Sequence, residues 1–366
     1  MSKMQRRKIG SSKDYALRSG RDAPPTATVV RHRCGTSPFD KNWLNWDCCG
    51  LICAVVTYML HLYGCYAVSF VLLPPWMSYK IDGGRKMTMW GKFHTFCFCL
   101  IAALAIISHF KAMTTDPGSI PPDAEPLADM LDSKDAVGPD SKPKPKPTPR
   151  TPKRICRRCN SYKPDRAHHC SICKRCILKM DHHCPWVNNC VGIGNHKYFL
   201  LFVFYTCVSC FYAIFLVILR FVECIGHLEK HEPCLDDPTN LLGIVGLVVE
   251  SMMFGIFTCC MVIDQWEVVI SNVTHIDRLK GETFMEDTEG SLAGINEVFG
   301  IGVGKRKRGG GRFRPDWLSP FVKVCFPENM KDQIMGFCRP CGFGKIKEDD
   351  YDSPGRKSSG SIAEIV

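Results

Sequence analysis

No secretory signal is expected in this sequence, because about 45 mostly polar residues precede its first apolar run. A small secreted scaffold held by disulfides is therefore disfavoured, although the 366 residues include 23 cysteines. The apolar runs also hold few ionisable residues, with His61 and His94 among them and no chain of carboxylates. A metal transporter, which needs ionisable residues within its spans, is disfavoured for that reason.

Four apolar stretches approach the ~20 residues that a helix needs to cross a ~30 Å hydrocarbon core. The composition, 45% hydrophobic with a net charge of +11, conceals a segregation of apolar runs from charged segments. This segregation favours a membrane protein with aqueous parts over one globular core. The second stretch contains His94 and Ser108, so a buried helix is the alternative there. The predicted spans are 50–73, 92–110, 198–222 and 241–263.

Lys and Arg are distributed unevenly among the polar segments. Ten lie before Trp46, sixteen from Lys111 to Lys197, and fifteen beyond Asp264. The connection 77–90 has three, and the connection 223–240 has one lysine against five acidic residues. The positive-inside rule predicts that both termini and the central loop are cytosolic, and that the two short connections face the lumen or the exterior.

Seven cysteines crowd between Cys156 and Cys190, a density typical of metal or thiol chemistry in a reducing compartment. Two zinc ions with closed tetrahedral shells need eight ligands, and thiolate and imidazole are favoured. If six cysteines and two histidines fill both shells, one cysteine and at least one histidine are left over. The segment reads Cys156-x2-Cys159-x9-His169-Cys170-x2-Cys173-x2-Cys176-x4-Asp181-His182-His183-Cys184-x5-Cys190.

The surplus cysteine indicates catalysis, because a thiol outside a closed zinc shell can act as a nucleophile. Asp181, His182 and Cys184 form a candidate acid, base and nucleophile set, in which Asp181 fixes the tautomer of His182 and His182 deprotonates Cys184. The alternative is a structural knuckle with one redundant ligand that binds protein or nucleic acid. As an adaptor that recruits proteins to a membrane, it would leave Cys184 dispensable.

These motifs resemble the DHHC protein acyltransferases, and the match is highly specific. It covers most of residues 47–321, with a subgroup likeness to the Golgi enzymes of vertebrates. The matching residues are Cys156, Lys163-Pro164-x-Arg166, His169-Cys170, Asp181-His182-His183-Cys184-Pro185-Trp186, Asn189-Cys190, Gly192, Asn195 and Phe199, with Asp116-Pro117-Gly118 before them and a weaker match at 296–300.

The resemblance implies a protein S-acyltransferase that moves a long-chain acyl group, expected to be palmitoyl, from acyl-CoA through Cys184 to a substrate cysteine. It implies catalytic roles for Asp181, His182 and Cys184, with the acyl chain held among the four helices. The expected partners are acyl-CoA, the lipid bilayer and membrane-associated proteins with cytosolic cysteines, and no nucleic acid. The implied zinc ligands are Cys156, Cys159, His169 and Cys176 for one structural ion, and Cys170, Cys173, His183 and Cys190 for the other.

One departure from the family concerns the segment after the fourth span. The family commonly has Thr-Thr-x-Glu there, whereas this chain has Thr274-His275-Ile276-Asp277. Docking of this segment on the zinc domain is therefore a weaker expectation than the chemistry.

Three residues near the motif are candidates for binding acyl-CoA. Lys163 and Arg166 are predicted to contact its phosphates, with solvated charge as the alternative. Trp186 is predicted to pack at the membrane surface or to line the acyl entrance.

On the lumenal side, Cys224 and Cys234 are candidates for a disulfide.

The predicted fold is an all-α membrane protein with four transmembrane helices and a small cytosolic two-zinc cysteine-rich domain between the second and third. The compartment is expected to be the Golgi, with the endoplasmic reticulum or another endomembrane as alternatives. The predicted parts are a disordered cytosolic N-terminus at 1–46, helices one and two at 47–118, a Pro/Lys-rich linker at 119–153, the cysteine-rich domain at 154–197, helices three and four at 198–263, and a cytosolic tail at 264–366.

Overall fold

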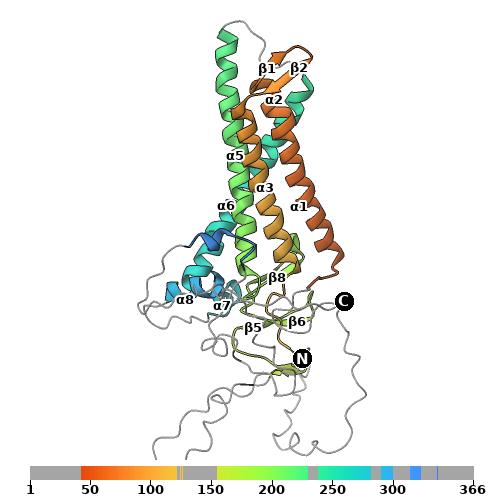
Figure 1. Cartoon of the computed structure of the whole chain (residues 1–366). Helices are drawn as coiled ribbons and strands as arrows, with labels where there is room; N and C mark the ends of the chain where they lie inside the picture. The colour runs from red at the N-terminus through yellow and green to blue at the C-terminus, as the bar shows by residue number, and fades with distance from the viewer. Residues whose placement is uncertain are drawn as a thin grey trace, which may run out of the picture.

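Four long helices run side by side and form the body of the protein (Figure 1). The computed structural model describes residues 43–121, 124, 126, 155–229, 238–281, 290–299, 314–322 and 336. The membrane-spanning candidates are Cys48–Trp76, Met89–Thr114, His196–Gly226 and Asn240–Ser271. Cysteine-rich hairpins lie between the second and third of them in sequence. The predicted fold class is therefore confirmed.

The first span changes helix type before it ends. It consists of α1 (Cys48–Tyr66), a π-helical segment (Ala67–Leu72) and a short α2 (Leu73–Trp76). The π-helical segment lies just before Pro74 and Pro75, which cannot donate backbone hydrogen bonds to the preceding turn. The chain then reverses in the antiparallel hairpin of β1 (Ser78–Ile81) and β2 (Gly84–Met87), at the end of the bundle opposite the cysteine-rich unit (Figure 1).

The helices extend beyond the apolar runs that predicted them. The second is α3 (Met89–Thr114), capped by Thr88, whose side chain accepts from the Gly91 N–H. The third is α5 (His196–Glu229), and the fourth is α6 (Pro238–Ser271). The predicted apolar run of α6 stops before Asp264, but the helix continues for two more turns. It ends at Asn272, which has a left-handed φ of 51°.

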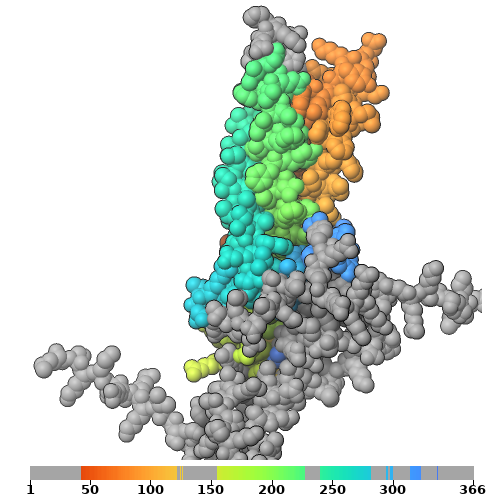
Figure 2. Space-filling view, turned by 90° about the vertical axis from the view of Figure 1, so that its left-hand side faces the viewer, coloured from red at the N-terminus to blue at the C-terminus, as the bar shows by residue number. Residues whose placement is uncertain are grey.

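Helix α5 lies at the centre of the packing, against α6 and α3. Figure 2 shows α5 and α6 side by side along one face of the bundle. Buried apolar side chains from several helices meet there, whereas large apolar side chains such as Phe70, Phe96 and Met253 stay exposed on the outside. A belt of this kind fits a bilayer around the bundle.

The cysteine-rich unit is built from three antiparallel hairpins. They are β3 (Ile155–Cys156) with β4 (Ser161–Tyr162), β5 (Ala167–Cys170) with β6 (Arg175–Leu178), and β7 (His182–Cys184) with β8 (Asn189–Val191). A 3-10 turn, η4 (Pro185–Val187), joins the last two strands.

Two contacts fix this unit to the end of α3 that lies away from the β1–β2 hairpin. This end of the bundle is called the inner end below. Asn189 donates to the backbone oxygens of Ala112 and Thr115 at 3.0 and 2.9 Å, which lie at the end of the helix. Gly194 packs directly on Asp116, where an added Cβ would lie 2.1 Å from the Asp116 oxygen. Because these contacts are close, the hairpins hold a fixed position against the helices.

Candidate functional site

Two groups of three cysteines and one histidine form within the hairpins. In each group the four ligand atoms lie within 4.8 Å of one another. Strand pairing explains the proximity, because His169 is opposite Cys176 and His183 is opposite Cys190. The groups are Cys156, Cys159, His169 and Cys176, and Cys170, Cys173, His183 and Cys190.

The two groups have the donor chemistry of closed zinc sites. Three thiolates and one imidazole are a common tetrahedral donor set for structural zinc. Each histidine presents Nδ1 to its cysteines, with His169 Nδ1 at 3.1 Å from Cys159 Sγ and His183 Nδ1 at 3.4 Å from Cys173 Sγ. These clusters can therefore bind zinc, and they are the same two sets of four that the family resemblance implied.

Cys184 belongs to neither group. Successive side chains of a strand point to opposite faces, so in β7 His183 faces the second group while His182 turns away from it. Cys184 is buried in an apolar cluster with Val187, Phe199 and Phe202. A buried thiol therefore lies beside the metal groups without being part of them.

Asp181 and His182 form a tight hydrogen-bonded pair next to Cys184. His182 Nδ1 lies 2.8 Å from Asp181 Oδ2. Burial lowers the pKa of His182, but its hydrogen bonds to Asp181 and Cys184 outweigh burial and raise this pKa to about 9. Burial likewise raises the pKa of Asp181, but the hydrogen bond from His182 and the other donors around it hold this pKa below its usual range. The pair is therefore Asp⁻ and imidazolium at neutral pH.

The two oxygens of Asp181 are held by further donors that the sequence analysis did not name. Gln265 donates to Oδ2 at 2.9 Å, and the backbone N–H of His275 donates to Oδ1 at 2.8 Å. Gln265 lies on the two turns of α6 beyond the apolar run. Asp181 is only 1% exposed, so these donors replace the water that a carboxylate would otherwise need.

A cavity opens between the helices next to Cys184. The space between its lining side chains, part of it open to the surroundings, is about 810 Å³, and the lining is mostly apolar. Its wall includes Cys184, Trp186, Phe202 and Phe254, and the ring centroids of Trp186 and Phe254 lie 6.1 Å apart. Trp186 therefore lines this cavity, and its place at an acyl entrance stays a prediction. The lining is that of a pocket for an apolar ligand.

Two ionisable residues of the helices also contact this region. Glu250 lines the cavity, and the sequence analysis missed it, although a carboxylate in the middle of the fourth apolar run was a visible signal. His109, near the inner end of α3, lies 2.8 Å from the backbone oxygen of Trp186 and 2.9 Å from the Tyr58 hydroxyl. His109 therefore fixes the turn that follows Cys184.

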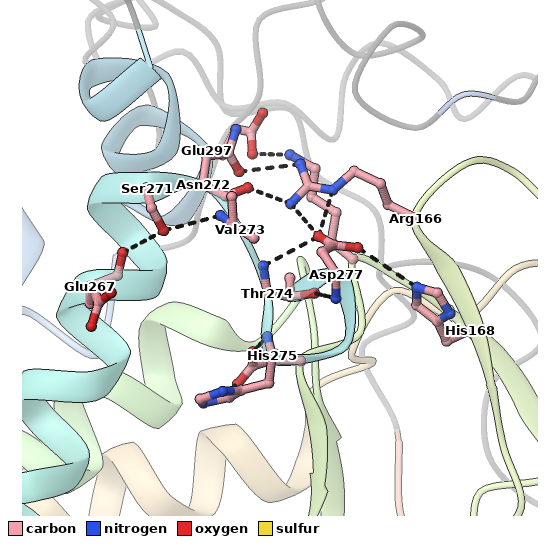
Figure 3. Close-up of polar contacts among 12 residues, drawn as sticks. Arg166, His168, Glu267, Ser271, Asn272, Val273, Thr274, His275, Asp277 and Glu297 are labelled. Carbon is pink, nitrogen blue, oxygen red and sulfur yellow. Dashed lines mark hydrogen bonds and ion pairs between the residues drawn. The ribbon is translucent and has the colours of Figure 1, made fainter. Parts of the chain in front are cut away.

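The segment after α6 docks on the cysteine-rich unit, as Figure 3 shows. It forms α7 (His275–Lys280), where Thr274 and Asp277 make a capping box. Asp277 is fully buried and lies 2.9 Å from Arg166 Nη2, which also donates to the Asn272 oxygen at 2.5 Å. Docking was the weaker expectation from sequence, and the structure has it with aspartate in place of the family's glutamate.

This docking changes the interpretation of Arg166. Its guanidinium is bound by Asp277 and Asn272, so the structure gives it a role in holding α7 and lends no support to a contact with CoA phosphates. Lys163 lies half-buried between β4 and β5. His168 lies outside both cysteine and histidine groups, and its Nδ1 accepts from Lys280 at 3.1 Å.

A second docked segment is α8 (Gly290–Phe299), which contains most of the weaker family match at 296–300. It packs against α6, where Gly294 approaches Val269 so closely that a Cβ would lie 2.0 Å from the Val269 oxygen. Glu297 accepts from Lys179, whose pKa burial lowers to about 8. Both segments after α6 therefore contact the cysteine-rich unit.

Asp277→Ala is expected to destabilise the protein by about 2–4 kcal/mol, because it leaves the buried Arg166 guanidinium without its carboxylate and removes the capping box. Burial raises the pKa of Asp277, but His168 and Arg166 hold it at about 2, so this stabilisation is complete above about pH 4 and is lost as the pH falls towards 2. Thermal unfolding at neutral pH in detergent measures the effect. Arg278→Ala on the same helix is the control, since its ion pair with Glu267 is exposed. Equal, small shifts for both variants would contradict a stabilising role for docking.

Comparison with known proteins agrees with this site. The family model for DHHC palmitoyltransferases matches residues 150–282. The chain is 33% identical to palmitoyltransferase ZDHHC3-A of Danio rerio over 310 residues, which cover 84% of this chain and 86% of that protein. It is 36% identical to palmitoyltransferase ZDHHC3 of Homo sapiens over 285 residues, covering 78% and 85%. A plant relative, probable protein S-acyltransferase 14 of Arabidopsis thaliana, is 33% identical over 286 residues, covering 74% and 88%. The family resemblance found in the sequence is confirmed, and the chain belongs to the DHHC palmitoyltransferases, as an enzyme that attaches acyl groups to protein cysteines.

Proposed function

We propose that the enzyme works by a two-step thioester exchange in which Cys184 carries the acyl group. One observation carries this proposal: Cys184 lies outside both cysteine and histidine groups, yet it contacts His182 and lines the apolar cavity. A thiol outside both groups, with a histidine on one side and an apolar cavity on the other, is the arrangement that acyl transfer needs.

Before the first step Cys184 has given its proton to His182, and the resulting thiolate attacks the carbonyl carbon of acyl-CoA. Asp181 holds the His182 tautomer and stabilises the imidazolium that forms. The pKa of about 9 at His182 keeps the proton there at neutral pH. The CoA thiolate then leaves and takes up the proton.

In the second step a cysteine of a membrane-associated protein attacks the thioester on Cys184. Its proton passes to His182, and the Cys184 thiolate is released. The acyl chain is proposed to occupy the cavity between the helices, with palmitoyl as the donor chain and Trp186 beside its carbonyl end. Transfer of such a chain from water is favourable by about 0.8 kcal/mol per buried methylene.

The two cysteine and histidine groups are proposed to hold one structural zinc ion each. Zinc, when bound, would fix the thiolates and supply folding free energy to hairpins that have little apolar core. The shells interleave along the chain, since neighbours such as His169 and Cys170 belong to different groups. Loss of one ligand is therefore expected to disturb both sites.

Lys163 remains the proposed contact for CoA phosphates.

The site is proposed to face the cytosol of a Golgi membrane, with both termini on the same side. The excess of Lys and Arg in the central and terminal segments supports this orientation, and the likeness to the Golgi subgroup supports the compartment. Cys224, near the opposite end of α5, is disulfide-bonded, which fits an oxidising lumen. Its pairing with Cys234 stays a prediction, because Cys234 lies outside the described residues.

Sealed microsomes test the orientation. Protease added outside is expected to cut the linker at 141–150 and to leave the acidic connection at 229–237 intact, because only the linker faces the cytosol. Detergent should expose both segments and serves as the control. Cleavage of 229–237 in sealed vesicles would overturn the four-span orientation.

The direct test of the mechanism is covalent loading. Purified protein incubated with palmitoyl-CoA is expected to acquire a fatty acid that hydroxylamine releases, because hydroxylamine cleaves thioesters. Peptide mass spectrometry should place that acyl group on Cys184. Fatty acid that resists hydroxylamine, or loading that spares Cys184, would contradict the proposed intermediate.

A further inference from the structure

Three cysteines near the inner end of α1 have no role in the chemistry described so far. Cys48 and Cys49 are exposed, and Cys53 is partly buried. All three are free thiols at the first turns of the first span, where the cysteine-rich unit meets the helices. Their position beside an enzyme that moves acyl groups between thiols makes them potential acceptors.

The first turn of α1 is fixed against the turn that follows Cys184. Gly50 packs so closely on Asn188 that an added Cβ would lie 2.1 Å from its Oδ1. Asn188 in turn donates to the Asn45 oxygen at 2.7 Å. Asn188 is the residue after η4, and η4 begins immediately after Cys184. The nucleophile and this end of α1 therefore keep a constant separation.

Cys53 lies on the side of α1 that packs against the rest of the protein. It is three residues after Gly50 and four before Thr57, a spacing that places all three on one side of a helix. Thr57 lines the same cavity as Cys184 and donates to the Cys53 oxygen at 2.9 Å. Cys184 lies near enough to Cys53 for a charge on one sulfur to affect the other, and Cys49 hydrogen-bonds to Cys53 from one turn earlier.

We propose that Cys53 is an acyl acceptor within the same chain, so that the enzyme acylates the inner end of its own first span. The proposal rests on the acyl-Cys184 intermediate. The Cys53 sulfur attacks the thioester carbonyl, a new carbon–sulfur bond forms, and the bond to Cys184 breaks. The proton of Cys53 passes to His182, which restores the imidazolium and thiolate pair of the unloaded site. No oxidant or reductant is needed, because one thioester replaces another.

Proximity and membrane position both favour this transfer. A thiol held beside a reactive carbonyl acts at a high effective concentration, whereas a separate substrate protein must first bind. A chain attached at Cys53 stays next to the helix bundle and the bilayer, so its methylenes remain in an apolar environment. Cys49 is exposed one turn nearer the cytosol and can take the group from Cys53 by the same exchange.

The test maps acyl groups on the full-length protein after incubation with palmitoyl-CoA. Hydroxylamine-labile palmitate is expected on Cys184 and on Cys53, and Cys184→Ser should lower the Cys53 label at least about tenfold because direct reaction with acyl-CoA lacks the positioned donor. Cys53→Ser should retain loading at Cys184. Cys48→Ser is the matched control, since Cys48 is five residues from Cys53 and points to another side of the helix, and both labels should persist in it.

A mixture of Cys184→Ser chains with Cys53→Ser chains separates transfer within a chain from transfer between chains. Transfer within a chain predicts no more palmitate on Cys53 in the mixture than in Cys184→Ser chains alone, and a higher label in the mixture would overturn the proposal. Loading of Cys184 without any label on Cys53 would overturn the proposal and leave the mechanism standing. An unlabelled Cys184 would overturn both.

Discussion

Cys184→Ser is expected to abolish hydroxylamine-labile acylation at residue 184 while the zinc content stays at two ions per chain. The hydroxyl of serine is a far weaker nucleophile than a thiolate, and an ester would resist hydroxylamine. Zinc should persist because Cys184 is outside both groups of four ligand atoms. Metal analysis and palmitoyl-CoA loading of the same preparation measure the two effects.

The matched control for this variant is another cysteine of the same strand pair. Cys190→Ser removes a member of the second group, so it is expected to lose zinc and to expose the hairpins to protease. Loss of zinc in Cys184→Ser would show that Cys184 is a ligand and would remove it from the chemistry. Full transferase activity in that variant would show that acyl transfer does not need Cys184.

Local sequence patterns predicted much of the fold because they act over short distances. The four spans follow from apolar length, and the hairpins bring together cysteines and histidines that lie close along the chain. The separation of His182 from the second group also has a local cause, since successive side chains of β7 point to opposite faces.

The contacts that support Asp181 come from far along the chain, and no local pattern specified them. Gln265 is 84 residues away from Asp181, and the His275 amide is 94 residues away. Gln265 was overlooked because the apolar run of α6 ends before it, although the helix continues. The engagement of Arg166 by Asp277, 111 residues apart, likewise depends on how α7 docks.

The His275 side chain shows what the departure from the family does here. Its Nε2 lies 2.8 Å from Asp264 Oδ2 and 3.9 Å from Asp181 Oδ2, so the imidazole lies near two carboxylates. The hydrogen bond to Asp181 Oδ1 uses the backbone N–H of residue 275, which any residue but proline supplies. The substitution of the second threonine therefore preserves the contact with Asp181.

The neighbouring histidines of the motif are expected to fail in different ways when replaced. His183→Ala removes a member of the second group, so zinc should be lost and the hairpins should become sensitive to protease. His182→Ala removes the proposed base, so zinc and fold should persist while acyl loading slows at neutral pH. His168→Ala is the control for the first effect, because His168 also lies beside a proposed ligand without belonging to a group.

The pH dependence of loading separates a lost base from a lost fold. His182 has its pKa raised to about 9, so the imidazolium that supports the Cys184 thiolate is present at neutral pH and is lost only as the pH rises through about 9. The unaltered enzyme should therefore load at a nearly constant rate from pH 7 to pH 8.5. In His182→Ala no imidazolium assists, and an unassisted thiol ionises near the reference pKa of ~8.5, so its loading rate should rise roughly 25-fold between about pH 7 and pH 9. His183→Ala should show no such recovery, because raising the pH does not restore a shell that lacks a ligand.

Initial rates of palmitate loading across this range, with zinc measured on each sample, check the assignment. A zinc-depleted His182→Ala beside a zinc-replete His183→Ala would mean that the two histidines have the opposite roles.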